Sequence, residues 1–250
     1  MRLAPFPAAA LAALVTISLS ACARAPEGEI PDPYEPMNRR VHAFNKGLDA
    51  SLVRPMARAV QRGGDGSPAP DTGAGPVQLL GNFGSNLSLP GKVVNSVLQG
   101  RPEPAVRNTF RFLVNTSLGL GGILDPASTD FGLPEIDTDF GETLHVWGVP
   151  SGAYLELPVL GPSTERDLVG KIVDFALIDP LDTVLTDEQK VAGTVGRIVS
   201  KAGDRARFGS TVDSVLHESA DSYAQTRLLY SQHRRHELKQ EEDVIDPYAE

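Results

Sequence analysis

Apolar residues recur at helical spacing along most of the chain. The first such stretch contains Met37, Val41, Phe44, Leu48 and Leu52. Intervals of three and four residues place these side chains on one face of a helix. The residue before a proline avoids the helical region, so Arg54-Pro55 is expected to kink or end this helix.

The spacing of apolar residues predicts further helices at about 77–87, 90–99 and 103–118. Residues 209 to 240 are the longest helical candidate. Residues 154 to 160 look extended, with Pro158 arguing against a central strand. Ser163 or Thr164 fits the N-cap of a following helix. The pattern as a whole predicts a mainly α protein of many short amphipathic helices.

The N-terminus has the features of a secretory leader. Arg2 is followed by an uncharged apolar run from Ala8 to Leu19, about 12 residues against the roughly 20 that a transmembrane helix needs. The run ends in Leu19-Ser20-Ala21-Cys22, which resembles the bacterial lipoprotein box. We therefore expect a signal peptide over residues 1–21 and a lipidated Cys22. An ordinary leader cut near Ala21 or Ala23 would instead leave a free thiol.

Ala23 adds an expectation about location. By the usual enterobacterial rule, an Asp after the lipidated cysteine holds a lipoprotein in the inner membrane, and here the residue is alanine. The outer membrane, facing the periplasm, is the predicted site. More than one acyl chain would make this anchoring effectively stable.

Composition excludes several function classes. The formal net charge of −9 argues against sequence-independent binding of nucleic acids, which needs clustered positive charge. The single cysteine excludes an intramolecular disulfide, a cysteine-based zinc site and a CxxC redox pair. The uncharged windows 112–124 and 143–155 are too short to cross a bilayer, but each could dip into a membrane interface. The alternative is a water-soluble periplasmic domain whose apolar stripes face its own core, and composition alone favours that alternative.

Candidate catalytic groups are weak. Gly161-Pro162-Ser163-Thr164-Glu165 lacks the final glycine of a nucleophile elbow, and helix capping explains Ser163 better. The glycines at 119, 121 and 122 are not followed by the Lys-Ser/Thr of a phosphate-binding loop. Asp213, His217 and Asp221 stand four apart and could hold a metal, although a solvated ion-pair face is the commoner arrangement. We expect no enzymatic activity, no metal and no cofactor.

An ordered series of short motifs resembles the MlaA (VacJ) family of outer-membrane lipoproteins over about residues 19 to 235. The series begins with the lipobox, Asp32-Pro33-x-Glu35-x-x-Asn38-Arg39, Phe44-Asn45, Arg54-Pro55, Asn82-Phe83, Asn86-Leu87, Pro90, Asn95 and Leu98-Gln99-Gly100. It continues with Arg111-Phe112-x-x-Asn115-Thr116-x-Leu118-Gly119-x-Gly121-Gly122, Asp125, Phe140-Gly141-x-Thr143-Leu144, Trp147-Gly148-Val149, Gly152, Tyr154, Leu157-Pro158, Leu160-Gly161-Pro162-Ser163 and Arg166-Asp167.

The resemblance implies an all-α fold, a single ring-like domain of short amphipathic helices seated in the membrane interface. It implies removal of misplaced phospholipids from the outer leaflet through a central amphipathic channel, which maintains lipid asymmetry. The implied partners are phospholipid, the outer membrane, a trimeric porin and a periplasmic phospholipid carrier. The alternatives are a non-transporting scaffold that binds porins or other periplasmic partners, and a lipid-hydrolysing enzyme.

This organisation divides the chain into four parts. They are a signal peptide (1–21), a lipidated tether (22–31), the helical domain (32–238) and an acidic tail (239–250). The Gly/Pro-rich loop 62–76 departs from the family pattern.

The lipid path is expected along Gly119, Gly121 and Gly122, with a channel hairpin near 174–196. Lys190 and Lys171 are the cations near it that could meet a phosphate, and both could equally face solvent.

Overall fold

The structure is a computed structural model that describes residues 30–63, 76–176 and 208–239, together with Thr186, Glu188 and Val191. Over these residues it is built from helices and one two-stranded hairpin, which confirms the predicted all-α class. Within the same ranges no helix is long and apolar enough to cross a membrane.

The first helical arm runs on without a break where the sequence predicted a kink or an end. Helix α2 (Glu35–Leu48) continues through the π-helix η1 (Asp49–Val53) into α3 (Arg54–Gly63). Proline supplies no N–H for an intrahelical bond. A widened turn immediately before Arg54-Pro55 accommodates that loss, so the prolyl residue does not end the arm.

Helices α4 (Pro76–Leu98) and α5 (Pro102–Ser117) pack along each other. The sequence predicted two helices separated near Pro90, but α4 passes through this residue. Proline keeps a helical φ and forfeits one backbone hydrogen bond, and the packing against α5 outweighs that cost.

Short helices follow, and their first turns are capped by aspartates. Asp125 caps α6 (Pro126–Thr129), and its side chain accepts a hydrogen bond from the Ser128 backbone N–H. Asp139 caps α7 (Phe140–Val146) and accepts from the Glu142 N–H at 2.7 Å. Each cap satisfies a backbone donor that has no partner within its helix.

Residues 154 to 164 form the hairpin of β1 (Tyr154–Leu157) and β2 (Gly161–Thr164), paired antiparallel with Leu157 opposite Gly161. The predicted extended segment is confirmed, although its last residues form the turn. Helix α8 (Glu165–Ala176) follows directly. Of the two N-cap candidates, Thr164 has that role, since its hydroxyl accepts from the Asp167 N–H at 3.2 Å.

The predicted long C-terminal helix is interrupted. Helix α10 (Gly209–Asp213) continues into the π-helix η3 (Ser214–Glu218), and α11 (Ser222–Lys239) starts after a break. The backbone becomes extended at Ser219, which ends η3. Residues 209 to 239 therefore form two helical stretches and not the one long helix that was predicted.

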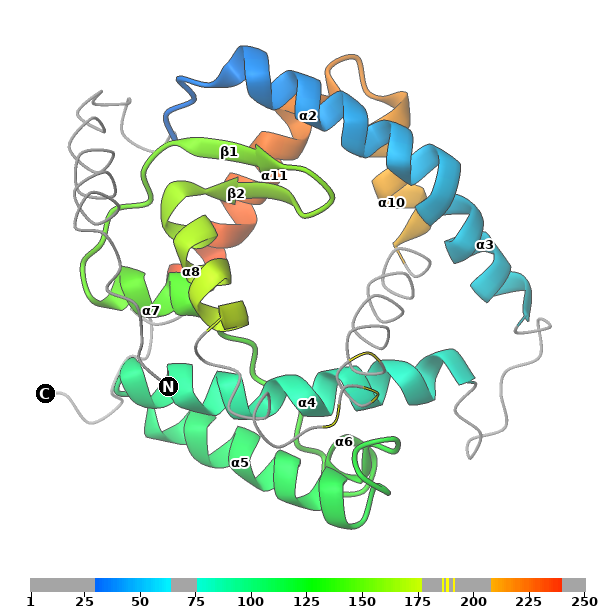
Figure 1. Ribbon diagram of the computed structural model, residues 1–250, viewed down its shortest axis with the longest axis vertical. Coiled ribbons are helices and arrows are strands. Elements are labelled where there is room, and N and C mark those ends of the chain that lie inside the picture. Colours follow the sequence, from blue (N-terminus) through cyan, green and yellow to red (C-terminus); the bar gives the residue numbers. More distant parts are fainter. Residues whose placement is uncertain are drawn as a thin grey trace, which may run out of the picture.

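Figure 1 shows the described elements arranged around a ring. α2 and α3 form one side, and α4 and α5 form the opposite side. The hairpin, α7 and α8 close a third side, and α10 lies across from them. The ring-like form expected from the family resemblance is thus present.

Two glycines allow α7 and α8 to cross closely. An ideal Cβ on Gly170 would lie 2.3 Å from the Gly141 nitrogen, which is backbone and cannot rotate away. We expect Gly170→Ala to lower the free energy of unfolding by about 3 kcal/mol, because overpacking forces backbone shifts. Thermal unfolding in detergent, followed by circular dichroism, measures this loss.

Gly47→Ala is the matched control. Gly47 lies in α2 with no atom within 4 Å of an ideal Cβ, so alanine should leave stability unchanged or raise it by up to about 1 kcal/mol. Equal unfolding temperatures for Gly170→Ala and the unsubstituted protein would show that the two helices do not cross as described.

Candidate functional site

Helix α5 exposes three large apolar side chains, although Ala105 and Val114 of the same helix are buried. Val106 is 69% exposed and Leu113 is 59% exposed, and Phe110 between them is also exposed. The Phe110 ring meets the exposed ring of Phe131 edge to face at 5.9 Å. Contiguous exposed apolar surface of this kind marks an interaction site.

Helix α2 has the same inverted arrangement. Its apolar stripe includes Met37 and Phe44, which are exposed, whereas Asn38 and His42 are buried. The expectation that the apolar stripes would face the protein's own core is therefore wrong for both helices. A 3.6-residue period locates a stripe but does not say whether the stripe faces a core or an apolar solvent.

Exposed large apolar side chains also occur on most other described elements. They include Val97 and Leu98 of α4, Leu118, Leu120, Ile123 and Leu124 after α5, Trp147 and Val149 after α7, and Ile172 and Phe175 of α8. The residues buried within the described part are polar more often than apolar. A protein that contacts lipid can carry such a distribution, because its outer surface does not need to be polar.

One buried polar cluster joins α5 to α6. Arg111 approaches both carboxylate oxygens of Asp125 at 3.2 Å and donates to Ser128 Oγ at 2.7 Å. Asn115 donates to Asp125 at 2.8 Å and accepts from the Ala127 N–H at 3.0 Å. Burial alone would raise the pKa of Asp125, but hydrogen bonds from Ser128 and Asn115 and the Arg111 charge hold it below its usual value.

A second cluster ties α7, α8 and α11 together. Arg234 of α11 lies 2.7 Å from an Asp139 oxygen and 3.2 Å from an Asp167 oxygen. Asp167 also accepts hydrogen bonds from Arg166 at 3.2 Å and from the Tyr230 hydroxyl. Burial opposes ionisation of Asp167, yet the two arginines and Tyr230 lower its pKa, so the carboxylate is charged and paired.

A third cluster holds the hairpin against the start of the domain. Asn38 donates to the Tyr154 carbonyl at 3.0 Å and accepts from the Glu156 N–H at 3.0 Å. The fully buried Tyr154 donates its hydroxyl hydrogen to Glu156 at 2.6 Å. Tyr223 of α11 donates to Asp32, which also accepts from Asn38 at 2.9 Å. Hydrogen bonds therefore hold the hairpin against α2 and α11, because apolar side chains that are exposed do not pack between these elements.

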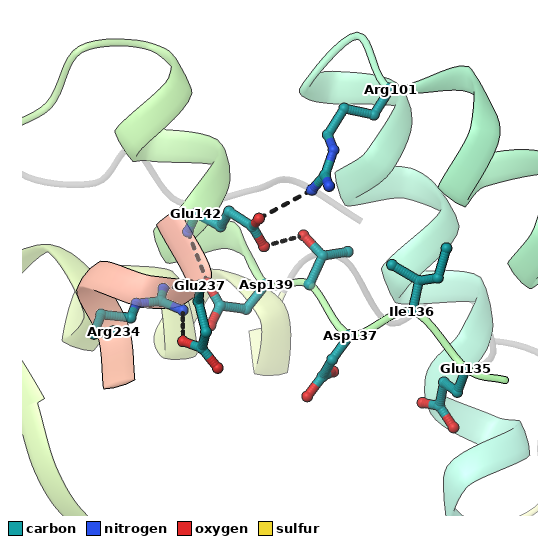
Figure 2. Close-up of a pocket in the computed structure, with 9 residues that line it drawn as sticks. Arg101, Glu135, Ile136, Asp137, Asp139, Glu142, Arg234 and Glu237 are labelled. Carbon is teal, nitrogen blue, oxygen red and sulfur yellow. Dashed lines mark hydrogen bonds and ion pairs between the residues drawn. The ribbon is translucent and has the colours of Figure 1, made fainter. Parts of the chain in front are cut away.

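A polar pocket of about 370 Å³ lies among the loop before α7, α7 and α11 (Figure 2). Apart from Ile136 its lining is polar or charged: Arg101, Glu135, Asp137, Thr138, Asp139, Glu142, Arg234 and Glu237. Figure 2 shows Arg101 directed at Glu142 and Arg234 directed at Glu237, each at 3.0 Å. An acidic lining repels a phosphate and offers no apolar wall to an acyl chain, so this pocket does not suit a phospholipid.

The three glycines expected near the lipid path form the turn after α5. A Cβ on Gly119 would lie 2.4 Å from the Asn115 carbonyl oxygen, and one on Gly122 would lie 2.3 Å from Asn86 Nδ2 of α4. Gly121 and Gly122 both have positive φ. The turn therefore requires glycine for its own geometry, and contact with lipid stays a prediction.

The structure describes only some of the other expected site residues. Cys22, Lys190 and most of the expected hairpin 174–196 lie outside the described residues, as do most of the loop 62–76 and the acidic tail. Lys171 donates to Ser163 Oγ at 3.0 Å. Ser163 is fully buried, which agrees with its rejection as a nucleophile.

The structure keeps two members of the Asp213, His217 and Asp221 group together and separates the third. Asp213 and His217 lie beside Asp49, with one possible ligand atom of each within 4.8 Å of the others, an arrangement that could hold a metal ion. Asp221 accepts a bidentate contact from Arg39 at 2.9 and 3.0 Å, which lowers the pKa of this carboxyl to about 2. His217 Nε2 lies 2.8 Å from Asp49, and Arg54 donates to Asp213 at 2.7 Å. Asp221 therefore belongs to an ion pair, whereas Asp213 and His217 come together with Asp49, a residue that the spacing did not include.

Sequence reasoning missed the role of the buried asparagines and arginines. Asn38, Arg111 and Asn115 stood out only as parts of motifs, yet each links segments that are distant along the chain. A signal was present, because asparagine and arginine within otherwise apolar helical segments need buried partners.

Comparison with known proteins gives a consistent result. The family model described as MlaA lipoprotein matches residues 30–237. An uncharacterized protein of Rickettsia felis is 34% identical over 80% of this chain and 74% of its own length. The Escherichia coli protein named intermembrane phospholipid transport system lipoprotein MlaA is 34% identical over 83% of this chain and 77% of its own length.

A solved structure is also similar. Its description reads "Structural basis for maintenance of bacterial outer membrane lipid asymmetry". The match has a TM-score of 0.66 and 31% identity, and it covers 83% of this chain and 98% of the solved one.

Proposed function

Because the chain belongs to the MlaA lipoprotein family, we propose that it removes misplaced phospholipids from the outer leaflet of the outer membrane. The lipids would pass through a central amphipathic path in the ring to a periplasmic carrier protein. The protein would thereby maintain the lipid asymmetry of the outer membrane.

The observation that carries this proposal is the inverted distribution of side chains. Val106 and Leu113 are exposed on α5, while Arg111 and Asn115 on the same helix are buried in a hydrogen-bonded cluster. Apolar faces of this kind are favoured in the membrane interface, where they leave water. The polar clusters hold the elements of the ring together alongside a smaller set of buried apolar residues.

Passive passage of lipid fits the position of the nearest candidate nucleophile better than lipid hydrolysis does. Ser163, the nearest candidate nucleophile, is fully buried and out of reach of a lipid. The proposed role is therefore non-enzymatic and needs no cofactor or metal.

The proposed partners follow the family resemblance. They are phospholipid, a trimeric porin that seats the ring in the membrane, and a periplasmic carrier. Gly119, Gly121, Gly122 and Lys190 remain proposed parts of the lipid path. A side chain at either Gly121 or Gly122 would strain the backbone, because both have positive φ, and at 122 it would also collide with Asn86.

Lipid asymmetry in cells lacking the protein tests the function. Transport predicts phospholipid accumulation in the outer leaflet, detected by surface labelling, together with sensitivity to detergent. A porin-binding scaffold predicts neither change. A hydrolase predicts altered lyso-phospholipid levels without accumulation of intact lipid.

Lipidation of Cys22 gives a separate expected result. Cys22→Ser should leave the chain uncleaved or soluble, because without acyl chains the polar tether does not hold the protein in a membrane. Membrane flotation and the apparent mass of the chain measure both effects. A serine variant that still floats with outer membranes and restores lipid asymmetry would contradict the anchor at this position.

A further inference from the structure

The turn between β1 and β2 has an unusual backbone. It consists of Pro158, Val159 and Leu160, all exposed. The Leu160 N–H donates to the Pro158 carbonyl at 2.8 Å, and Val159 between them has a φ of 68°. This is a γ-turn with positive φ, a rare and strained form, and a β-branched residue is the least suited to it.

Asn45 of α2 holds this turn from outside the hairpin. Its Oδ1 accepts from the Val159 N–H at 2.8 Å, and its Nδ2 donates to the Leu157 carbonyl at 2.9 Å. The Asn45 side chain thus forms hydrogen bonds with both Leu157, the last residue of β1, and the strained Val159. Glycine would adopt this φ freely, so the backbone gives no reason for valine here.

The strain presents two apolar side chains at the tip. Val159 is 70% exposed and Leu160 is 64% exposed. Figure 1 shows the tip of the hairpin inside the ring of elements, pointing away from α7 and in the direction of α10. Helix α8, which packs against β2, also exposes Ile172 and Phe175. Strained residues that persist in a fold cluster at functional positions, so the tip is a candidate contact.

We propose that the β1–β2 tip contacts the acyl chains of a phospholipid inside the ring, and that Asn45 is the residue that positions it. The inference rests on the proposed function and names a contact within it. Val159 and Leu160 offer apolar surface and no charge, which suits an acyl chain and not a headgroup. A slender chain also reaches the inside of a ring more readily than a folded partner does.

Photo-crosslinking in cells tests the contact without relying on transport. The full-length protein carries p-benzoylphenylalanine in place of Leu160 and is illuminated, and its adducts are identified by mass spectrometry. We expect a phospholipid adduct. The same probe in place of Asp137, whose side chain is exposed in the acidic pocket, should give none. A protein adduct alone, or no adduct at Leu160, would overturn the proposal.

Val159→Gly tests the side chain without threatening the fold, since glycine relieves the strained φ. The unfolding temperature should not fall, while clearance of outer-leaflet phospholipid should slow by about tenfold for the loss of one valine contact. Unchanged clearance would overturn the role of the tip.

Asn45→Ala tests the positioning role. Combined with the probe at 160, it should lower the adduct yield there and leave unchanged the yield from a probe in place of Phe175. Equal loss at both positions would overturn positioning by Asn45.

These outcomes separate the inference from the function on which it rests. If deletion of the protein slows clearance but the probe at 160 finds no lipid and Val159→Gly is fully active, the inference alone fails. If deletion leaves clearance unchanged, the proposed function fails whatever the probe reports.

Discussion

Arg111→Met is expected to lower the free energy of unfolding by about 3–5 kcal/mol, the usual cost of removing one partner from a buried ion pair. Arg111 is almost fully buried and reaches Asp125, Ser128 and the Leu133 carbonyl. Methionine fills a similar volume but leaves these acceptors without their donor. Chemical unfolding in detergent, followed by circular dichroism, measures the loss.

Arg107→Met is the matched control, one turn earlier on α5. Arg107 pairs with the exposed Glu103 of the preceding turn, an arrangement worth only about 0.3–0.5 kcal/mol. If the two variants lose the same stability, the Arg111 cluster does not hold α5 to α6.

The cluster of Arg111 and Asp125 also predicts that the stability of the fold falls on acidification. The pKa of Asp125 in the folded protein lies below its usual value, so the carboxylate stabilises the fold at pH values above its unfolded pKa. That contribution is lost as pH falls through the folded pKa. Asp125→Asn should therefore be less stable at neutral pH and lose less stability on acidification, which unfolding curves at several pH values detect.

Val106→Glu combined with Leu113→Glu is expected to abolish function while sparing the fold. Both side chains are exposed, so the charges meet no packed neighbours in detergent. In a membrane, each charge that has to enter hydrocarbon costs about 2.5–3.5 kcal/mol. The variant should unfold at the normal temperature but fail to restore lipid asymmetry in cells.

A control with the same added charge separates the site from the charge itself. Gln225 and Gln232 are exposed polar residues of α11, so Gln225→Glu combined with Gln232→Glu should remain active. Surface labelling of phospholipid and detergent sensitivity compare the two double variants. Full activity of the α5 variant would show that this face does not contact lipid.

The helices themselves were largely predictable, because apolar periodicity locates an amphipathic segment. The direction of each stripe was not predictable. The spacing of Met37 and Phe44 is the same whether they face a core or lipid, and only their exposure in the folded chain distinguishes the two. Continuity through Pro55 and Pro90 was also missed, since local preference for a break is weaker than tertiary packing.

The candidate site was less predictable than the fold. The Asn45 contact with Val159 joins residues far apart in the chain, and no spacing rule reaches across that distance. The glycines after α5 were recognised as special, but the requirement for glycine at 122 comes from the close approach of Asn86, which belongs to another helix. Family motifs marked these residues, and the three-dimensional contacts explain them.

The rate at which phospholipid leaves the outer leaflet tests the central claim most directly. A labelled phospholipid is loaded into the outer leaflet of living cells, and its remaining surface fraction is followed with time. Cells that contain the protein should clear the label, whereas cells without it should retain the label until the protein is restored. Equal rates of clearance with and without the protein would contradict removal of phospholipid by this lipoprotein.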